Sequence, residues 1–351
     1  MMFIRGFLLW SALLFCIQAQ ADPGFRQIKS SDRNGEALNV AVWYPASSKG
    51  ITEYAGENPA FIGVAVIRDA PPVPGVHPLL VISHGYNGNW RNLSWIAAAM
   101  AAQGYIVAAP DHPGTSTFNQ DPADAKMLWR RPHDITQVID SVIHSPGLFG
   151  ETDKDRIAAL GHSLGGWTVM SLAGARFDPA RFMHDCRQHP QRGDCRLTAK
   201  LGIDEARSQE KLSASHRDAR IRAVVSLDLG LAPGFTPRSL HDIDLPVLIL
   251  AARVDRLAQL PAGQESKYLA AGMRAQWRQF AIVDGATHFS FMQLCKPGAE
   301  TLINEESPGD GVVCRDGSGA SRPGIHQELV RKISAFLNSS LDYHAPAGET
   351  K

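Results

Sequence analysis

One short segment constrains the fold of this chain more than any other: an apolar run that meets Gly161-His162-Ser163-Leu164-Gly165 and continues into an Ala/Leu/Met-rich stretch. Glycines on both sides of Ser163 permit a strained backbone and a close approach of helix to strand. A chain that turns this sharply from strand to helix holds the serine hydroxyl above the edge of a sheet. The segment therefore predicts a strand, a turn and a helix, with Ser163 as the candidate nucleophile.

The composition is that of a folded α/β protein without a charged tail. The 351 residues include 35 basic and 35 acidic side chains, so the formal net charge is zero and no basic surplus indicates a nucleic-acid partner. At 44% hydrophobic residues, the chain can build a large core. We find no internal repeat and no linker that would split it. We expect residues 22–351 to form a single domain, and the protein to be a monomer.

Residues 1–21 resemble a secretory signal peptide. Arg5 precedes an apolar run over residues 6–17, and Ala-Gln-Ala follows as a cleavage site. The run is too short to span a bilayer. A lipoprotein signal with lipidated Cys16 is the alternative, but Phe15 is bulky where a small residue is expected. We predict a secreted or periplasmic protein with no stable membrane anchor.

Four cysteines remain after removal of the predicted signal peptide. An even number in an exported chain suggests disulfides, and four cysteines allow three connectivities. We favour Cys186–Cys195 and Cys295–Cys314, because each pair falls within one polar segment that contains Gly or Pro. Unpaired thiols are the alternative. Neither pair has the Cys-x-x-Cys spacing of a zinc site.

Strand and helix signals alternate along most of the chain. Apolar or β-branched runs predict strands over residues 36–44, 61–67, 79–83, 105–109, 221–227, 246–252 and 277–283, besides the strand before Ser163. Helical patterns cover residues 92–103, 134–143, 264–272 and 325–337, besides the helix after Ser163. This alternation predicts an α/β fold with a mostly parallel sheet and helices on both faces.

Residues 176–220 interrupt this alternation. The segment is highly charged, carries the first cysteine pair and shows no clean strand. It lies between the helix after Ser163 and the next strand, so we predict a cap or lid insertion over the active site. A surface excursion without a catalytic role is the alternative.

A nucleophilic serine requires a base and a carboxylate. His288 follows the last predicted strand, 125 residues after Ser163, and is the candidate base. Asp255 and Asp228 both follow strands at the sheet's carboxyl edge and compete for the role of the acid. We favour Asp255, and Asp228 would then anchor a loop or line the substrate pocket. In hydrolases whose nucleophile lies in a Gly-x-Ser-x-Gly turn, the triad residues follow one another along the chain as serine, acid and histidine. His112 precedes Ser163, so we interpret it as a loop residue.

Two backbone N–H groups are candidates for an oxyanion hole, which stabilises the negative oxygen of a tetrahedral intermediate. Tyr86 follows the strand over residues 79–83 within a glycine-bearing loop, and Leu164 follows the nucleophile. An ordinary turn after the strand is the alternative for Tyr86. Trp90, Trp95 and Trp167, with Tyr86, are candidates for an apolar pocket, although core packing is the alternative for each.

The motifs Ser-His-Gly-Tyr, Gly-His-Ser-Leu-Gly-Gly, the strand-end Asp255 and Gly-Ala-Thr-His-Phe resemble bacterial α/β hydrolases known as predicted dienelactone hydrolases. They also resemble secreted polyester-degrading cutinases and platelet-activating-factor acetylhydrolases. The resemblance covers most of residues 36–340 and implies the α/β-hydrolase fold, with Ser163 as nucleophile, His288 as base, and Tyr86 and Leu164 as oxyanion donors. Cutinase-like enzymes place the acid at the position of Asp255, and the acetylhydrolases at that of Asp228. True dienelactone hydrolases have cysteine in place of Ser163, so lactone opening is not implied.

These observations predict an exported serine esterase that acts through an acyl-enzyme on a small or polymeric ester and needs neither metal nor organic cofactor. The same triad serves amide, peptide or phospholipid acyl hydrolysis, and these remain the alternatives. A non-catalytic binding protein on the same fold is a more distant one, since nucleophile, base and acid are all present.

Overall fold

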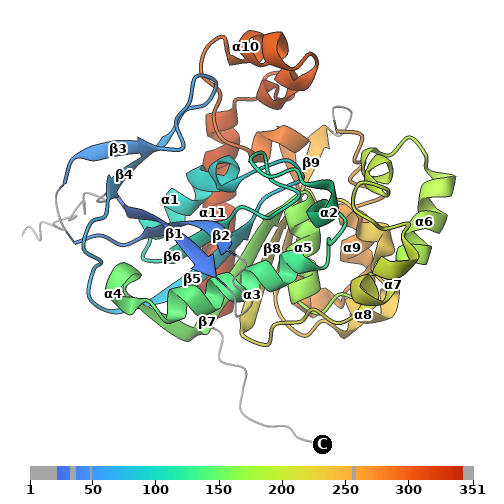
Figure 1. Ribbon diagram of the computed structural model, residues 1–351, viewed down its shortest axis with the longest axis horizontal. Coiled ribbons are helices and arrows are strands. Elements are labelled where there is room, and N and C mark those ends of the chain that lie inside the picture. Colours follow the sequence, from blue (N-terminus) through green and yellow to red (C-terminus); the bar gives the residue numbers. More distant parts are fainter. Residues whose placement is uncertain (1–21, 32–36, 48–49, 255–257, 343–351) are drawn as a thin grey trace, which may run out of the picture.

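A ten-stranded sheet runs through the molecule (Figure 1). The computed structural model describes residues 22–31, 37–47, 50–254 and 258–342, so the predicted signal peptide lies outside the described residues. The strand order is β10-β9-β8-β7-β5-β6-β2-β1-β4-β3. The strands are β1 (Gly24–Ser31), β2 (Ala37–Tyr44), β3 (Thr52–Ala55), β4 (Val64–Arg68), β5 (Val76–Ser83), β6 (Ile106–Pro110), β7 (Glu151–His162), β8 (Ile221–Leu227), β9 (Val247–Val254) and β10 (Arg278–Thr287).

The strands from β10 to β6 are parallel, and β2 joins β6 in antiparallel fashion. Their apolar runs are buried on both faces, as expected where helices cover a parallel sheet on each side. The helices are α1 (Ser94–Ala101), α2 (Pro122–Ala125), α3 (Arg130–Ile143), α4 (Pro146–Phe149), α5 (Leu164–Leu172), α6 (Pro179–Gln188), α7 (Ala206–Ser213), α8 (Pro237–Asp242), α9 (Ser266–Gly272), α10 (Ala299–Glu306) and α11 (Arg322–Leu341).

Two clusters of apolar side chains fill the two sides of the sheet. Helices α3, α5 and α9 bury their apolar residues in one cluster, and α1 and α11 bury theirs in the other. This division follows from strand geometry, because successive side chains of a strand point to opposite faces. Val81 of β5 belongs to the first cluster, and its neighbours Leu80 and Ile82 belong to the second. The predicted α/β class, with helices on both faces, is confirmed.

The predicted cap segment is helical and shares the main core. It contains α6 and α7, and its apolar residues Phe182, Leu201 and Leu212 lie in the cluster that includes α5. The disulfide Cys186–Cys195 closes a short loop within the segment. The segment therefore packs into the same core as α5, and its role as a cap over the active site stays a prediction.

A buried cation joins the cap segment to the body of the domain. Arg192 Nε lies 2.6 Å from Asp194 Oδ1 and 2.9 Å from Glu265 Oε1. Asp194 Oδ2 accepts the N–H of Leu231 at 2.7 Å, in the loop after β8. Burial raises the pKa of Glu265 well above its usual value, with the neighbouring Asp194 carboxylate adding to the effect. Breaking this cluster would leave buried charges unpaired, so it fixes the segment firmly.

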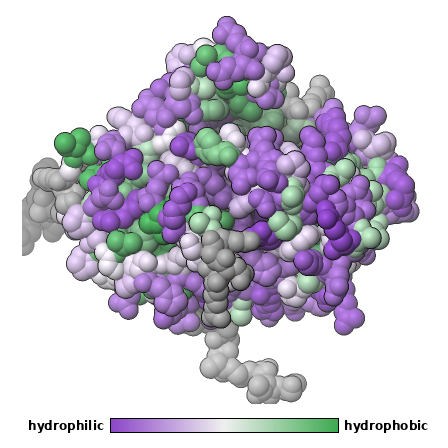
Figure 2. Space-filling model, viewed as in Figure 1, coloured by the Kyte–Doolittle hydropathy of each residue, from purple (hydrophilic) through white to green (hydrophobic). Residues whose placement is uncertain are grey.

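The segment between β10 and α11 carries α10, which projects at the top of Figure 1. The disulfide Cys295–Cys314 closes it, with an S–S length of 2.01 Å. Both predicted cysteine pairings are therefore confirmed. The face shown in Figure 2 is mostly hydrophilic, with apolar residues in small separate groups. Within the described residues, none of the helices is both long enough and apolar enough to cross a bilayer.

Two strands, β1 and β3, were not predicted from the sequence. Both β1 and β3 lie in the half of the sheet beyond β2, where β3 is the edge strand. Strand β3 has four residues, of which three are exposed, so its sequence lacks the apolar run that marks a buried strand. Strand β1 alternates buried and exposed residues, several of them polar.

Candidate active site

Ser163 occupies the sharp turn between β7 and α5. Its backbone has φ 56° and ψ −120°, a conformation that non-glycine residues rarely adopt. Its own N–H donates to the carbonyl of Leu227 at 3.0 Å, which fixes the turn against β8. The predicted strand, turn and helix around Ser163 are therefore present, and the side chain is half-buried at the carboxyl end of the sheet.

The flanking glycines are needed because backbones meet closely at this turn. A Cβ on Gly161 would lie 2.0 Å from the carbonyl oxygen of Gly165. A Cβ on Gly165 would lie 1.9 Å from the carbonyl oxygen of Ser83, at the end of β5. Both distances are far below van der Waals contact, so only glycine fits at either position.

His288 is held by a carboxylate from a neighbouring strand end. Its Nδ1 lies 2.7 Å from Oδ2 of Asp228, the residue that follows β8. The other oxygen, Oδ1, accepts the N–H of Ala252 in β9 at 2.8 Å. Asp228 and His288 are both buried, at 3% and 5% exposure. Because an ionised carboxylate only accepts, His288 donates from Nδ1, and this leaves Nε2 as an acceptor.

His162, the residue before Ser163, connects the Ser163 turn to His288. His162 donates from Nε2 to the backbone carbonyl of His288 at 2.9 Å, and the two rings lie 4.7 Å apart between centroids. Burial, with His288 nearby, lowers the pKa of His162 well below its usual value, so its ring is neutral. Within the described residues no hydrogen bond joins Ser163 Oγ to the His288 ring. Such bonds are often long in free enzymes and tighten only with substrate bound.

Asp255, the favoured acid of the sequence prediction, lies outside the described residues. The described part of β9 ends at Val254, one residue earlier. Asp228, the alternative acid, is the carboxylate that contacts His288 in the described structure.

The two candidate oxyanion donors come from segments next to Ser163. The loop residue Gly85 is so close that a Cβ on it would lie 3.6 Å from Ser163 Oγ. Tyr86 follows directly, in a turn closed by a hydrogen bond from Gly88 N–H to the carbonyl of Gly85 at 3.1 Å. Leu164 is the first residue of α5, where an N–H has no acceptor inside the helix. The oxyanion role of both residues stays a prediction.

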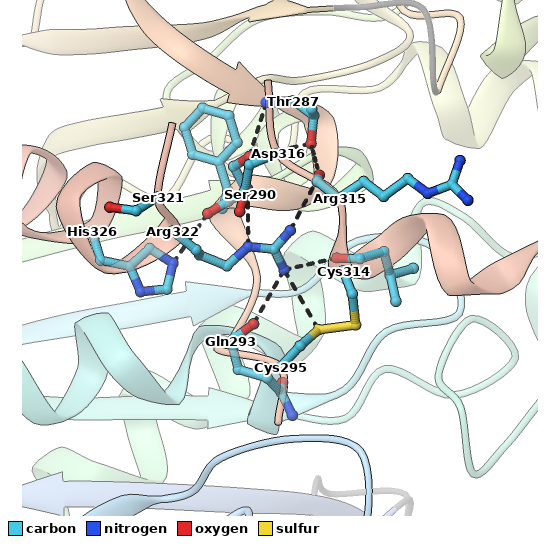
Figure 3. Close-up of polar contacts among 12 residues, drawn as sticks. Thr287, Ser290, Gln293, Cys295, Cys314, Arg315, Asp316, Ser321, Arg322 and His326 are labelled. Atoms are coloured by element: carbon cyan, nitrogen blue, oxygen red, sulfur yellow. Dashed lines mark hydrogen bonds and ion pairs between the residues drawn. A yellow bond between two sulfur atoms is a disulfide. The ribbon is translucent and has the colours of Figure 1, made fainter. Parts of the chain in front are cut away.

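A cluster that the sequence did not indicate holds the turn after His288 (Figure 3). Ser290 Oγ accepts the N–H of Thr287 at 2.9 Å and donates to the carboxylate of Asp316. Arg322 Nε donates to the same carboxylate at 3.1 Å. The Arg322 guanidinium also contacts the carbonyl of Val313 beside the disulfide Cys295–Cys314. We name Thr287, Ser290, Asp316 and Arg322 the Arg322 cluster.

The four aromatic residues proposed for an apolar pocket differ in their burial and contacts. Trp90 and Trp167 are buried, and Trp90 packs on Phe25 at 5.5 Å between ring centroids, so core packing is the correct interpretation for both. Trp95 stacks on His326 at 3.8 Å and donates to a backbone carbonyl. Tyr86 alone is only half-buried, and burial raises the pKa of its hydroxyl.

Comparisons with known proteins bear on the fold of this chain. A family model described as serine aminopeptidase, S33, matches residues 75–183, from β5 through the turn into α6. The structure of a ferulic acid esterase from Streptomyces cinnamoneus superposes with a TM-score of 0.61 at 19% identity, covering 93% of this chain and 94% of that one. The chain is therefore an α/β-hydrolase by fold.

The similar curated proteins are cutinases from Thermobifida species. Cutinase est2 of Thermobifida alba is 22% identical over 213 residues, which is 60% of this chain and 52% of the cutinase. Cutinase 2 of Thermobifida cellulosilytica is 29% identical over 101 residues, which is 28% of this chain and 35% of that protein. The chain thus spans about half the length of the first of these relatives.

Proposed function

We propose that this protein is a serine hydrolase of carboxylic esters. The observation that carries the proposal is the strained turn at Ser163 beside a buried His288–Asp228 pair, all at the carboxyl edge of the parallel strands of the sheet. Sites in open α/β sheets form at this edge. The similarity to cutinases and to a ferulic acid esterase supports ester chemistry.

The reaction proceeds in two steps through an acyl-enzyme. His288 Nε2 accepts the proton of the Ser163 hydroxyl while Oγ attacks the ester carbonyl carbon. The tetrahedral oxyanion receives hydrogen bonds from the N–H groups of Tyr86 and Leu164. His288 then gives its proton to the leaving alcohol, and the acyl-enzyme forms. Water then gives a proton to His288 Nε2 and attacks the acyl carbon. His288 returns this proton to Ser163 Oγ as the bond between Oγ and the acyl carbon breaks, which releases the acid and restores the free enzyme.

Asp228 is the acid of this proposal, in place of Asp255. It accepts from Nδ1 of His288 and thereby holds the tautomer in which Nε2 is free to accept from Ser163. The Ala252 N–H on its other oxygen fixes the carboxylate itself.

The carbonyl substrate is proposed to be an ester, small or polymeric. The match to a serine aminopeptidase model keeps amide hydrolysis as the second candidate, because the same triad serves both reactions. Export to the periplasm or medium, a cap role for residues 176–220 and a monomeric state also belong to the proposal. The two disulfides support export, since such bonds persist in oxidising compartments.

The test is hydrolysis of p-nitrophenyl esters of increasing acyl length, with matched p-nitroanilides. We expect ester turnover, and labelling of Ser163 by a fluorophosphonate. Ser163→Ala should lower kcat by at least about 1,000-fold, because a triad acts as one unit. Ser307→Ala, at an exposed position after α10, is the matched control. Full turnover by Ser163→Ala would refute the assignment, and faster anilide cleavage would favour the amide candidate.

A further inference from the structure

A second chain of serine, histidine and aspartate lies buried behind the loop that carries Tyr86. Ser83 Oγ is 2.9 Å from Nε2 of His112, and Nδ1 of His112 is 2.7 Å from Oδ2 of Asp134. Ser83 and His112 are fully buried, and Asp134 is 6% exposed. No substrate can reach a serine enclosed in this way, so Ser83, His112 and Asp134 have a role other than covalent catalysis.

The hydrogen-bonding capacities of these groups fix the direction of every bond. The carboxylate of Asp134 accepts, so His112 donates from Nδ1 and accepts at Nε2 from the Ser83 hydroxyl. Burial, with Arg131 and His84 nearby, lowers the pKa of His112 well below its usual value, so the ring is neutral. A neutral ring has one donor and one acceptor, and both are used.

Arg131 of α3 closes the network from the other side. Its Nη2 donates to Ser83 Oγ at 3.1 Å and to the backbone carbonyl of His84. Its Nε donates to Thr168 of α5 at 3.0 Å, and Thr168 donates in turn to the carbonyl of Leu164 at 3.1 Å. Burial lowers the pKa of Arg131 to about 9, so the side chain remains a cation at neutral pH.

His84 transmits the network to the loop. The backbone N–H of His112 donates to His84 Nε2 at 3.0 Å, so the hydrogen of the neutral His84 ring is on Nδ1. That Nδ1 donates to the carbonyl of Gly85 at 2.7 Å. Burial lowers the pKa of His84 to about 3, and its ring is therefore neutral throughout the range in which an esterase would act.

The carbonyl of Gly85 belongs to the same peptide unit as the N–H of Tyr86. In a trans peptide these two groups point in opposite directions within one plane, so fixing the carbonyl fixes the N–H. Two donors hold this carbonyl, His84 Nδ1 at 2.7 Å and Gly88 N–H at 3.1 Å. The close approach of Gly85 to Ser163 places this peptide unit beside the nucleophile.

We propose that the network of Ser83, His84, His112, Arg131 and Asp134 positions the Gly85–Tyr86 peptide so that its N–H stabilises the oxyanion. The inference rests on the proposed function and extends it to positioning residues that do not touch substrate. It also accounts for a chain of buried polar groups in a place where apolar residues could fill the same volume. The side-chain donors and acceptors named above have partners, and the network reaches the loop through His84, which accepts from His112 N–H and donates to the Gly85 carbonyl.

Two nearly isosteric substitutions of His84 test this role. His84→Gln keeps an amide acceptor near the Nε2 position but loses the donor to the Gly85 carbonyl. His84→Asn keeps an amide donor near the Nδ1 position and should restore that contact. His144→Ala, at the exposed C-terminal end of α3, is the matched control on a histidine outside the network.

The readout is the ratio of kcat/KM for a p-nitrophenyl ester to that for its thionoester, in which sulfur replaces the carbonyl oxygen. Sulfur accepts hydrogen bonds weakly, so an intact oxyanion hole favours the oxygen ester. His84→Gln should lower this ratio by about 10-fold or more, through loss of turnover of the oxygen ester. His84→Asn and His144→Ala should leave the ratio within about 3-fold of the wild type. A merely structural role would lower both rates together.

The outcomes separate the two proposals. Absence of Ser163-dependent turnover in the wild type would refute the esterase function itself. An active wild type whose ratio is unchanged in His84→Gln would overturn the positioning role alone. If His84→Gln does not fold, His112→Asn gives the same decision, because it keeps the bond to Asp134 and loses the acceptor for Ser83. A ratio unchanged there would overturn the proposal equally.

Discussion

Replacing Asp228 with Asn tests the proposed acid most directly. The Asn carbonyl can keep the hydrogen bond from Ala252 N–H, now 2.8 Å from Oδ1, so the buried side chain retains its place. The amide group then faces His288 Nδ1, where an acceptor stands at 2.7 Å in the wild type. Because the amide only donates, Nδ1 must accept and the ring hydrogen moves to Nε2. His288 can then no longer accept the proton of Ser163.

The expected loss in kcat/KM is on the order of 10,000-fold, the size seen when a triad histidine is held in the wrong tautomer. At 1.36 kcal/mol per tenfold change, this corresponds to about 5.5 kcal/mol of transition-state stabilisation. The assay is hydrolysis of a p-nitrophenyl ester across pH 5 to 9, with near-UV circular dichroism to confirm the fold. Asp255→Asn is measured beside it, and we expect a smaller loss. A larger loss for Asp255→Asn would refute the reasoning and return the acid to Asp255.

Three further predictions concern stability. Arg322→Met should lower the free energy of unfolding, measured in urea, by about 3 kcal/mol, because it leaves the carboxylate of Asp316 without its buried cation. A change below about 0.5 kcal/mol would contradict the role of the Arg322 cluster. Gly165→Ala should lower the free energy of unfolding by about 3 kcal/mol or more, because the new Cβ would clash with the Ser83 carbonyl. Gly147→Ala, whose Cβ would have no atom within 4 Å, should be nearly neutral, and equal thermal midpoints of the two variants would contradict this. Burial lowers the pKa of His326 to about 4 in the folded state, so its contribution to stability is present above pH 6.5 and is lost as the pH falls toward 4. Urea unfolding at pH 7, 6 and 5 should therefore show a pH dependence that is weaker in His326→Gln by up to about 1.4 kcal/mol per pH unit, and identical slopes would contradict it.

The central strands were predictable because they are buried on both faces. A short apolar run bounded by turn residues is typical of such a strand, and β8 has the predicted bounds, residues 221–227. The turn at Ser163 was predictable for a related reason, since two glycines around one serine indicate close backbone contacts at that point. Edge strands such as β3 lack any such pattern, because one side of the strand and much of its surface remain in water.

The sequence could not decide between the two candidate acids. Asp228 and Asp255 follow adjacent parallel strands, and neighbouring strands lie only about 4.8 Å apart, so spacing along the chain favours neither. What brings Asp228 to His288 is a local turn: its φ is 44°, and its N–H donates to the carbonyl of Leu250 at 2.7 Å. A single aspartate with positive φ leaves no mark in a sequence that could be told from an ordinary strand end.

The fold contains two serine–histidine–aspartate chains with the same 2.7 Å bond between acid and imidazole, so residue types alone do not define a catalytic triad. The difference lies at the hydroxyl. Ser83 Oγ receives a hydrogen bond from the Arg131 cation and is enclosed, so it has no room for an incoming carbon atom. Ser163 stands on a strained turn, half-buried, and its hydroxyl makes no hydrogen bond within the described residues. Chain order excluded His112 as the base for a sound reason, yet it could not reveal that His112 is bound to Ser83. The flanking glycines at residues 161 and 165, which permit the close backbone contacts of this turn, therefore support the functional prediction more than the three residue types do.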